Sequence, residues 1–482
     1  MKNFKLNFDF KTKHASLSAL ITFAVFAALI ILNLIVGKFD LKLDLTPKKL
    51  FSLTDETKAI ITKLDKPVEI YALYQSGSEP ENIMETLKEY ERLSKNISVK
   101  VIDPDRNPGL LSKYVKDDKP AQKGSLIVSC GDNYRIISGM DLYEISYTQQ
   151  GQPQIIGQKI EQQVTAAAAY VSSGKILNIY EITGHNETTL ASLGYSKILE
   201  QSNYRLNEIS LIRSDIPEDA AILTLISPRA DLSETEVNKL DKYVSAGGVL
   251  FVALDLLNTP SENLFSFLKK WDIEVLNGLV METEKNRLIS EFGDNPFIFA
   301  PLMSDFEALE PLKRSKSDPV FQATMGFRRT AAQQKQLEYY SILHSSDISR
   351  FREASGDKLS GDPNPVPGDK KGPVDVAVAV RKRNLENYRP EGATIVAVGT
   401  ASSFKGLGFM GQIKGNADLL LNLINWAVDD DSTVNVPSKS LYRMPLRISA
   451  ETGLIYAAVS IILIPLFFLS AALFVYFRRK NK

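Results

Sequence analysis

The sequence predicts an α/β protein that is anchored in a membrane at both ends. Three observations lead to this prediction. An uncharged apolar run lies near each terminus, strand-like and helix-like segments alternate after the first run, and a longer alternation of the same kind precedes the second run. About 415 residues separate the two runs, which is enough for two or three domains with hydrophobic cores of their own.

The apolar runs cover residues 17–36 and 453–477, which are 20 and 25 residues without a charge. A helix needs about 20 apolar residues to cross a hydrocarbon core roughly 30 Å thick, so both runs are long enough. A buried core helix would carry a polar stripe, which neither run has. The first run exceeds the ~7–15 apolar residues of a cleaved signal peptide and no small-x-small site follows it, so we expect an uncleaved anchor.

The short tails predict the orientation in the membrane. Basic residues flank both runs on the side of the body, but long loops cross membranes largely regardless of their charge. The tail 1–16 carries several lysines, and the tail 478–482 is almost entirely basic. We therefore expect a two-pass protein of the cell membrane, with both termini in the cytoplasm and the large body outside it.

Residues 37–157 predict an N-terminal α/β domain. Thr54, which precedes acidic residues, is a typical helix N-terminus. Cys130 lies at the end of a predicted strand, where a packed thiol is expected. A strand, an amphipathic helix and a strand predict a β-α-β unit with a parallel pair, and two further strands predict a hairpin. These segments are 67–74, 81–94 and 97–102 for the unit, and 126–129 and 134–137 for the hairpin.

Residues 158–174 predict a helix that connects this domain to a second α/β domain at 175–436. Apolar strands alternate with helices in the second domain, which predicts a mostly parallel sheet covered on both faces. The strands are expected at 175–181, 205–212, 221–226, 249–254 and 393–398, and the helices at 191–201, 234–245 and 416–428. Residues 258–384 are expected to be an irregular insertion, in which 355–373 are too polar and too rich in Pro and Gly to fold. A juxtamembrane linker at 437–452 completes the body.

Composition and missing motifs exclude several classes of function. Lys plus Arg and Asp plus Glu both number 57, so no net field attracts nucleic acid. One cysteine excludes a disulfide framework and a cysteine-based zinc cluster, and three histidines leave little for metal binding or acid–base chemistry. No P-loop, G-x-S-x-G, H-E-x-x-H or C-x-x-C motif occurs, so we expect no ATP hydrolysis by this chain and no catalysis.

One dinucleotide-type pattern, G-x-G-x-x-G, occurs at residues 406–411. A dinucleotide site needs these glycines to follow a strand directly and to open a helix, so that the helix N-terminus meets the pyrophosphate. Residues 400–405 separate the pattern from the preceding strand, and the next helix begins only near residue 416. We therefore expect a mobile glycine loop and no cofactor.

A polar cluster follows the predicted strand 175–181, and further polar residues follow two other strands. In an open α/β sheet, ligands bind at the carboxyl ends of the strands, so these residues are expected along one edge. The candidate residues for a ligand or partner pocket are Thr183, Gly184, His185, Glu187, Asp255, Thr400 and Ser402. A second interpretation stays open, because Thr, Asn and Asp also close turns and cap helices. No nucleophile with a neighbouring base can be named.

The ordered segments together resemble the GldG-like auxiliary components of ABC transporters, a family first associated with bacterial gliding motility. The resemblance is carried by DLTPKKLFSLTDETKAII (44–61), PVEIYALY (67–74), IEQQVTAAAAYV (160–171), TGHNE (183–187), SETEVNKLDKYVSAGGVLFVALD (233–255), ILHSSDISRF (342–351), VAVGTASSF (396–404), GNADLLLNLINWAVDD (415–430) and the terminal FRRKNK. It covers nearly the whole chain in order. It implies that the domain at 175–436 is similar to class I glutamine amidotransferases but lacks their cysteine nucleophile, because Cys130 lies in the preceding domain.

The resemblance implies a non-catalytic accessory subunit of a bacterial ABC transport complex, whose body binds a substrate, envelope material or a partner. It implies two partners: a permease in the membrane and, through the permease, a cytoplasmic ABC ATPase. Two other hypotheses stay open. One is an envelope-facing hydrolase or transferase that acts at His185 and Glu187, and the other is a structural scaffold for cell-surface machinery.

Overall fold

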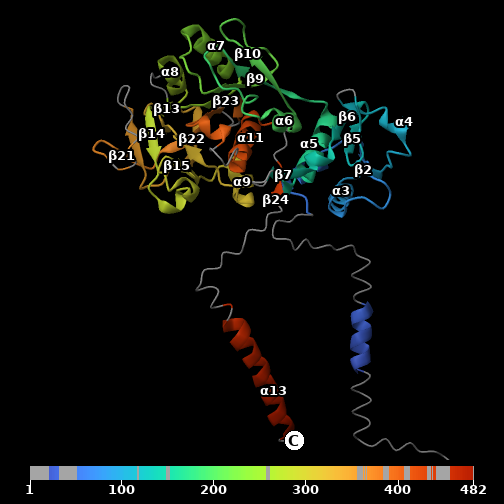
Figure 1. The fold of residues 1–482 in the computed structure, drawn as a ribbon. Coiled ribbons are helices and arrows are strands. Elements are labelled where there is room, and N and C mark those ends of the chain that lie inside the picture. The colour runs from blue at the N-terminus through green and yellow to red at the C-terminus, as the bar shows by residue number, and fades with distance from the viewer. Residues whose placement is uncertain are drawn as a thin grey trace, which may run out of the picture. The chain divides into compact units, whose positions relative to one another are not determined.

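The structure is a computed structural model, shown as a ribbon in Figure 1. It describes residues 21–31, 52–116, 119–147, 152–256, 261–354, 362, 364, 366–383, 390–406, 413–430, 436, 438–440, 456 and 458–480. The predicted N-terminal tail, both flanks of the first apolar run and most of the glycine pattern at 406–411 lie outside the described residues. By its contacts the chain divides into two compact units, Met1–Glu144 with Gln158–Lys439 and Ile145–Gly157 with Ser440–Lys482.

One helical stretch in the described residues, Val459–Arg478, is long and apolar enough to cross a membrane. It consists of a π-helical turn, Val459–Leu463, and helix α13, Ile464–Lys480. Its apolar side chains are exposed in the absence of a bilayer. The described part of the first apolar run is a shorter apolar helix, Ile21–Ile31. The described part of the C-terminal apolar run therefore has the expected helical form, and the two-pass topology stays a prediction.

A four-stranded sheet forms the core of the N-terminal part, in the order β2-β1-β5-β6. Its strands are β1 (Val68–Ala72), β2 (Ile97–Val101), β5 (Leu126–Cys130) and β6 (Asn133–Ile137), and its helices are α2 (Asp55–Thr62) and α3 (Glu81–Leu93). The predicted β-α-β unit is confirmed, because β1 and β2 pair in parallel across α3. The hairpin β5–β6 is confirmed as well, and Cys130 is a buried free thiol. Thr54 caps α2, since its Oγ1 accepts the amide of Thr57 at 3.3 Å.

Helix α5 (Ile160–Ser173) is part of this N-terminal core, where the sequence predicted a connecting helix. Its apolar side chains, among them Val164 and Ala168, belong to the same buried cluster as the strands β1 and β5. A helix that is apolar on most of its faces is stable only when neighbours cover it, and four consecutive alanines let the sheet approach closely. The helix ends at Gly174, whose φ of +70° suits glycine.

A ten-stranded mixed sheet forms the larger part, in the order β10-β9-β11-β12-β23-β22-β18-β13, with β19 on β22 and β16 on β19. Five neighbouring strands are parallel: β10 (Tyr204–Ile209), β9 (Leu177–Ile182), β11 (Ala220–Ile226), β12 (Val249–Ala253) and β23 (Pro390–Val398). The remaining strands join antiparallel: β22 (Asp375–Arg383), β19 (Leu337–His344), β18 (Gly326–Arg329), β13 (Ile273–Leu276) and β16 (Leu302–Met303).

The prediction of an irregular insertion at 258–384 was therefore wrong. All five antiparallel strands and helix α8 (Glu262–Lys270) lie wholly in this stretch, so the sheet is mixed where a mostly parallel one was expected. The antiparallel strands are short or carry charged residues, such as Arg328 and Lys382, which hides their alternation in the sequence. Part of the polar loop 355–373 is ordered too, because Arg352 donates from Nε and Nη2 to Asp369, each at 2.9 Å.

Helices cover both faces of this sheet, as expected (Figure 1). Alternate residues of β12 belong to two separate buried clusters: Phe251 packs with α6 (Ser196–Gln201) and α11 (Lys414–Val428), and Leu250 packs with α7 (Glu234–Ser245) and α8. Helix α6 starts at Ser196 and not at residue 191, because turns occupy the preceding residues. The other elements are β3 (Val115–Lys116), β4 (Lys119–Pro120), α4 (Pro108–Leu111), η1 (Gly139–Leu142), β7 (Tyr143–Tyr147), β8 (Pro153–Gln158), β14 (Gly278–Met281), η2 (Lys285–Arg287), η3 (Ser290–Phe292), β15 (Ile298–Phe299), η4 (Glu307–Leu309), α9 (Glu310–Ser315), β17 (Phe321–Gln322), β20 (Arg350–Glu353), β21 (Lys370–Lys371), α10 (Ser402–Lys405) and β24 (Lys439–Ser440).

Candidate functional site

The predicted site residues do come together at the carboxyl ends of β9, β11, β12 and β23, which are neighbours in the sheet. The loop after β9 is tied to the loop after β11, because the amide of Arg229 donates to the carbonyl of His185 at 2.8 Å. Arg229 in turn lies 3.7 Å from Asp255 after β12. The parallel order of the strands therefore produces the shared edge that the sequence predicted.

His185 is enclosed by two buried carboxylates. Its Nδ1 lies 2.9 Å from Glu187 Oε1, and its Nε2 lies 3.2 Å from Glu236 Oε2. The side chains of Glu187 and Glu236 are only 1% and 3% exposed. Glu236 also completes a capping box with Ser233 at the start of α7. Both ring nitrogens are therefore engaged within the protein, so His185 joins the β9 loop to helix α7.

Asp255 holds the start of the short helix α10. Its Oδ1 accepts the amides of Ala401 and Ser402, each at 3.0 Å, and the Ser402 hydroxyl at 2.8 Å. Its Oδ2 accepts the hydroxyl of Ser227 at 2.7 Å. The predicted neighbours Asp255 and Ser402 are thus in direct contact, with the carboxylate in the role of a helix cap.

Thr400 is fully buried and points away from Asp255. Its Oγ1 donates to the carbonyl of Gln322 at 2.9 Å and lies 3.0 Å from the hydroxyl of Ser403. Thr183 donates from its amide to the carbonyl of Ile209 at 2.8 Å, which continues the pairing of β9 with β10. Gly184 is exposed, and its φ of +134° is one that a side chain rarely tolerates. Contacts within the protein thus account for each of these side chains, and a binding role for them stays a prediction.

The chemistry available at this edge is limited by these contacts. Ser402 has a carboxylate partner, Asp255, but no contact with His185, because both ring nitrogens of His185 face Glu187 and Glu236. Burial raises the pKa of Glu181, the last acidic residue of β9, whose carboxylate accepts the amide of Leu190. In the part of the chain that the structure describes, no group of three or more His, Cys, Asp or Glu side chains is arranged to hold a metal ion.

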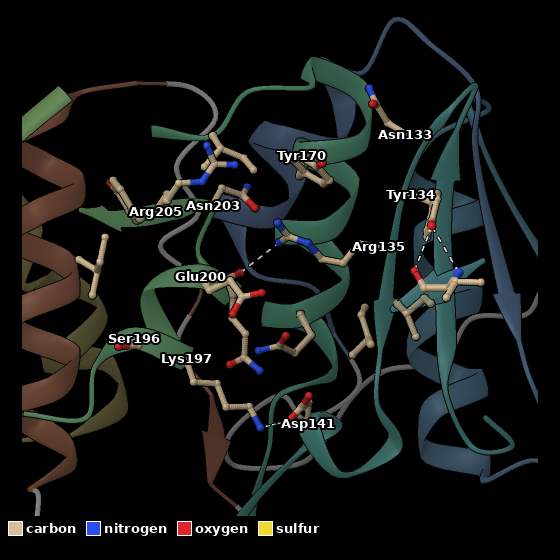
Figure 2. A pocket seen from close by; sticks show the side chains of 18 of the residues that line it. Asn133, Tyr134, Arg135, Asp141, Tyr170, Ser196, Lys197, Glu200, Asn203 and Arg205 are labelled. Carbon is tan, nitrogen blue, oxygen red and sulfur yellow. Dashed lines mark hydrogen bonds and ion pairs between the residues drawn. The ribbon is translucent and has the colours of Figure 1, made fainter. Parts of the chain in front are cut away.

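A cavity of about 780 Å³ lies elsewhere, between the N-terminal sheet and the larger sheet (Figure 2). It is lined by β6, α5, α6 and the start of β10. Its walls are joined by Asn203, which donates from Nδ2 to the carbonyl of Ala166 at 3.1 Å, and by an ion pair of 2.5 Å between Lys197 and Asp141. No motif in the sequence marks this cavity, because its residues come together only when the two sheets pack.

Arg135 on β6 lies across this cavity, as Figure 2 shows. Its guanidinium stacks on the ring of Tyr170, 4.5 Å from the ring centroid, and reaches the carbonyl of Gln201 at 3.5 Å. Burial lowers the pKa of Arg135, while the charges of Tyr170 and Glu200 act in the opposite direction. The cavity thus contains a guanidinium that stacking holds in place and that uses few of its five N–H donors.

The two ends of the body meet at Glu161, in the first turn of α5. Glu161 Oε1 accepts the amide of Thr54 at 2.6 Å and its hydroxyl at 2.8 Å. Glu161 Oε2 lies 2.6 Å from Nζ of Lys439, which also donates to the carbonyl of Ser52 at 2.7 Å. The side chains of Glu161 and Lys439 are 4% and 11% exposed. We call these four residues the Glu161 cluster; the sequence gives no sign of it, because Lys439 is remote from the other three.

Comparisons with known proteins bear on both parts of the chain. A domain of unknown function matches residues 47–156. The search of curated proteins gave no match. Among solved structures, an N-terminal domain of mmIFT52 is 13% identical and covers 52% of this chain and 98% of its own, with a TM-score of 0.37. A ThuA-like protein from Parabacteroides merdae is 11% identical, covering 58% and 96% with a TM-score of 0.31. PurLQS from Thermotoga maritima is 9% identical, covering 52% and 99% with a TM-score of 0.23.

The family model described as an ABC-type uncharacterized transport system matches residues 178–422. The matched segment begins in β9 and ends within α11, so it contains the strand-end edge and nearly all of the ten-stranded sheet. It spans just over half of the 482 residues. The chain therefore belongs to this family of ABC transport auxiliary components.

Proposed function

We propose that the chain is a non-catalytic accessory subunit of a bacterial ABC transport complex, anchored in the cell membrane at both ends with its body outside the cytoplasm. The family supports a transport-associated role. The helix Val459–Arg478 supports association with a membrane. The proposal adds to these observations a second anchor, the orientation in the membrane, and the binding of a substrate or partner by the body.

The Glu161 cluster is the observation that carries the two-anchor proposal. It holds Ser52 and Thr54, just after the segment that leads from the first apolar run, against Lys439, just before the segment that leads to the second. Those segments contain 15 and 12 residues (37–51 and 441–452). At ~3.3–3.6 Å per extended residue they reach at most about 54 Å and 43 Å. Because both segments start from one point of the body, we expect both anchors to enter the same membrane.

The partners follow from what the chain lacks and from its family. It contains no P-loop, so the energy for transport must come from another subunit, for which a cytoplasmic ABC ATPase coupled through a membrane permease is the natural source. An amidotransferase-like origin of the larger part is compatible with this role. The chain's one cysteine, Cys130, lies in the N-terminal sheet and cannot serve as a nucleophile at the strand-end edge.

Co-purification tests the assignment to a complex. The full chain, tagged and extracted from its native membrane in a mild detergent, is expected to bring down a multispan permease and an ABC ATPase. If the preparation contains neither protein although both are expressed in the same membranes, the proposal is refuted.

Cysteine labelling tests the topology. In a Cys130→Ser background, single cysteines are placed at Lys2, at Lys482 and at the exposed Ser76 between β1 and α3. A membrane-impermeant maleimide added to intact cells is expected to label only the Ser76→Cys variant. Labelling of either tail from outside would refute the orientation.

The hydrolase or transferase alternative is weakened by the contacts of His185, because a general base needs a free ring nitrogen to take a proton. The variants Glu187→Gln and His185→Gln separate the two proposals. If either abolished transport while the complex still assembled and the chain stayed folded, catalysis at this turn would regain support.

A further inference from the structure

The cavity between β6 and β10 is bounded by two sheet edges. Strand β6 is the last strand of the four-stranded sheet, and β10 is the last strand of the ten-stranded sheet. All five residues of β6 line the cavity, as do Tyr204, Arg205 and Leu206 of β10. In the described part of the chain, neither strand pairs with another on its outer side. Each edge therefore presents a row of backbone N–H and C=O groups without a ladder partner.

Three basic and three acidic side chains line the cavity, and two of the basic ones can receive an acidic ligand. The six are Arg135, Lys197, Arg205, Asp132, Asp141 and Glu200. Lys197 is already paired with Asp141, and the charge of Glu200 acts on Arg135. Arg135 and Arg205 form no ion pair with any described residue, so both guanidiniums can still pair with a carboxylate. Arg135 cannot swing away freely, because its guanidinium is stacked on Tyr170. Figure 2 shows the Arg135 side chain extending between α5 and α6, in the direction of Arg205 on β10. A carboxylate that accepted from Arg135 would make charge-assisted hydrogen bonds in a partly enclosed site.

We propose that this cavity binds an extended polypeptide segment of a partner protein, which adds to the edge of β6 and places an acidic side chain against Arg135. A strand added to an edge obtains its affinity from main-chain hydrogen bonds and its specificity from pockets for alternate side chains. A polypeptide can pair with the backbone N–H and C=O groups along the five residues of β6, whereas a compact carboxylate is too short to do so. The inference rests on the proposed function, since it names the place where an accessory body recruits its partner.

The experiment uses the full chain in nanodiscs. A phage-displayed library of random decapeptides is selected on it, and selected peptides are synthesised with a fluorescent label for anisotropy titrations. We expect selected peptides to share one Asp or Glu, and Kd to rise at least about tenfold when Gln replaces that residue, the loss of one charge-assisted interaction. N-methylation of alternate peptide bonds should abolish binding, because it removes the main-chain donors.

Variants of the chain place the peptide in the cavity. Arg135→Gln is expected to weaken binding at least about tenfold, with partial rescue by Arg135→Lys, which keeps the charge but not the planar fork. If Arg135→Gln fails to fold, Arg205→Gln tests the proposal instead, because residue 205 is exposed and its substitution should leave the fold intact. The matched control is Arg106→Gln. Arg106 is 81% exposed, follows β2 at the opposite edge of the same sheet, and should leave Kd unchanged.

Four results would overturn the proposal: no peptide is selected; binding is insensitive to Arg135→Gln and Arg205→Gln; free glutamate competes as well as the peptide; or sedimentation shows that a second copy of the chain occupies the edge. Failure of this inference is distinguishable from failure of the proposed function. The permease and the ATPase would still co-purify with a chain whose cavity binds no peptide.

Discussion

Replacing Glu161 by alanine removes the acceptor at which the two ends of the body meet. The substitution deletes two hydrogen bonds from Thr54, at 2.6 and 2.8 Å, and the ion pair of 2.6 Å with Lys439. It leaves the Lys439 ammonium, which is 11% exposed, without this carboxylate. Removing one partner of a buried ion pair destabilises a protein by about 3–5 kcal/mol, because the remaining charge stays desolvated. We expect Glu161→Ala to lower the free energy of unfolding by an amount in that range.

The measurement is urea unfolding of the full chain in a mild detergent, followed by circular dichroism. Hydrogen exchange adds local information, since the amides of α2 should lose protection when Thr54 loses its contacts with Glu161. A double-mutant cycle with Lys439→Met isolates the contribution of the Glu161–Lys439 ion pair to the free energy of unfolding. The single variants should each be strongly destabilised, and the double variant should be less destabilised than the sum of the two.

An exposed ion pair provides the matched control. Glu353 and Lys370 pair across β20 and β21 with side chains 60% and 57% exposed, so Glu353→Ala should change stability by about 0–1 kcal/mol. If Glu161→Ala cost no more than this control, or if the cycle with Lys439→Met were additive, the Glu161 cluster would not hold the ends of the body together. The proposal that two anchors leave the body at one point would then lose its support.

Three further outcomes are expected. Burial raises the pKa of Asp418 from 3.8 to about 6, in spite of the nearby Lys414. Its charged form therefore destabilises the folded chain by up to about 3 kcal/mol above pH ~6, and this cost disappears below pH ~4. Asp418→Asn should accordingly stabilise the chain at pH ~8 and have no effect at pH ~4, in urea titrations at both values; equal effects at both would contradict the assignment. His185→Ala removes the hydrogen-bond partner that the ring gives to the buried Glu187 and Glu236, so it should cost about 1–3 kcal/mol in thermal unfolding, with partial recovery on adding Glu236→Gln. Gly399→Ala would place a Cβ 2.2 Å from the carbonyl oxygen of Met325, so a loss of about 1–3 kcal/mol is expected in the same assay, and a variant as stable as the parent would refute it.

The local elements of the fold were predictable from the sequence alone. Apolar periodicity and cap residues act within one turn or one strand, so they mark elements wherever the chain places them. Thr54 at the start of α2, the helix α7 and the apolar strand β12 are found where the sequence predicted them. The resemblance to ABC transport auxiliary components is confirmed over residues 178–422, where it depends on the order of such segments along the chain.

The direction of strands and the role of α5 were not predictable in this way. β22 joins β23 antiparallel and extends the sheet through residues that the sequence analysis expected to be irregular. α5 has the pattern of a buried helix, but nothing in that pattern says which neighbour covers it. Both features depend on pairings between segments far apart in the chain, which local periodicity does not encode.

By itself, the sequence determined that the chain has apolar runs at its ends, an α/β body between them, and polar residues at the carboxyl ends of particular strands. Only the tertiary structure decided what those residues contact. His185 lies between Glu187 and Glu236, of which the second is 51 residues away, and Glu161 meets Lys439 across the whole body. The cavity at Arg135 exists because two sheets pack side by side. A buried polar group is satisfied by whichever partner the packing brings within about 3 Å, so its role follows from the topology and not from its neighbours in sequence.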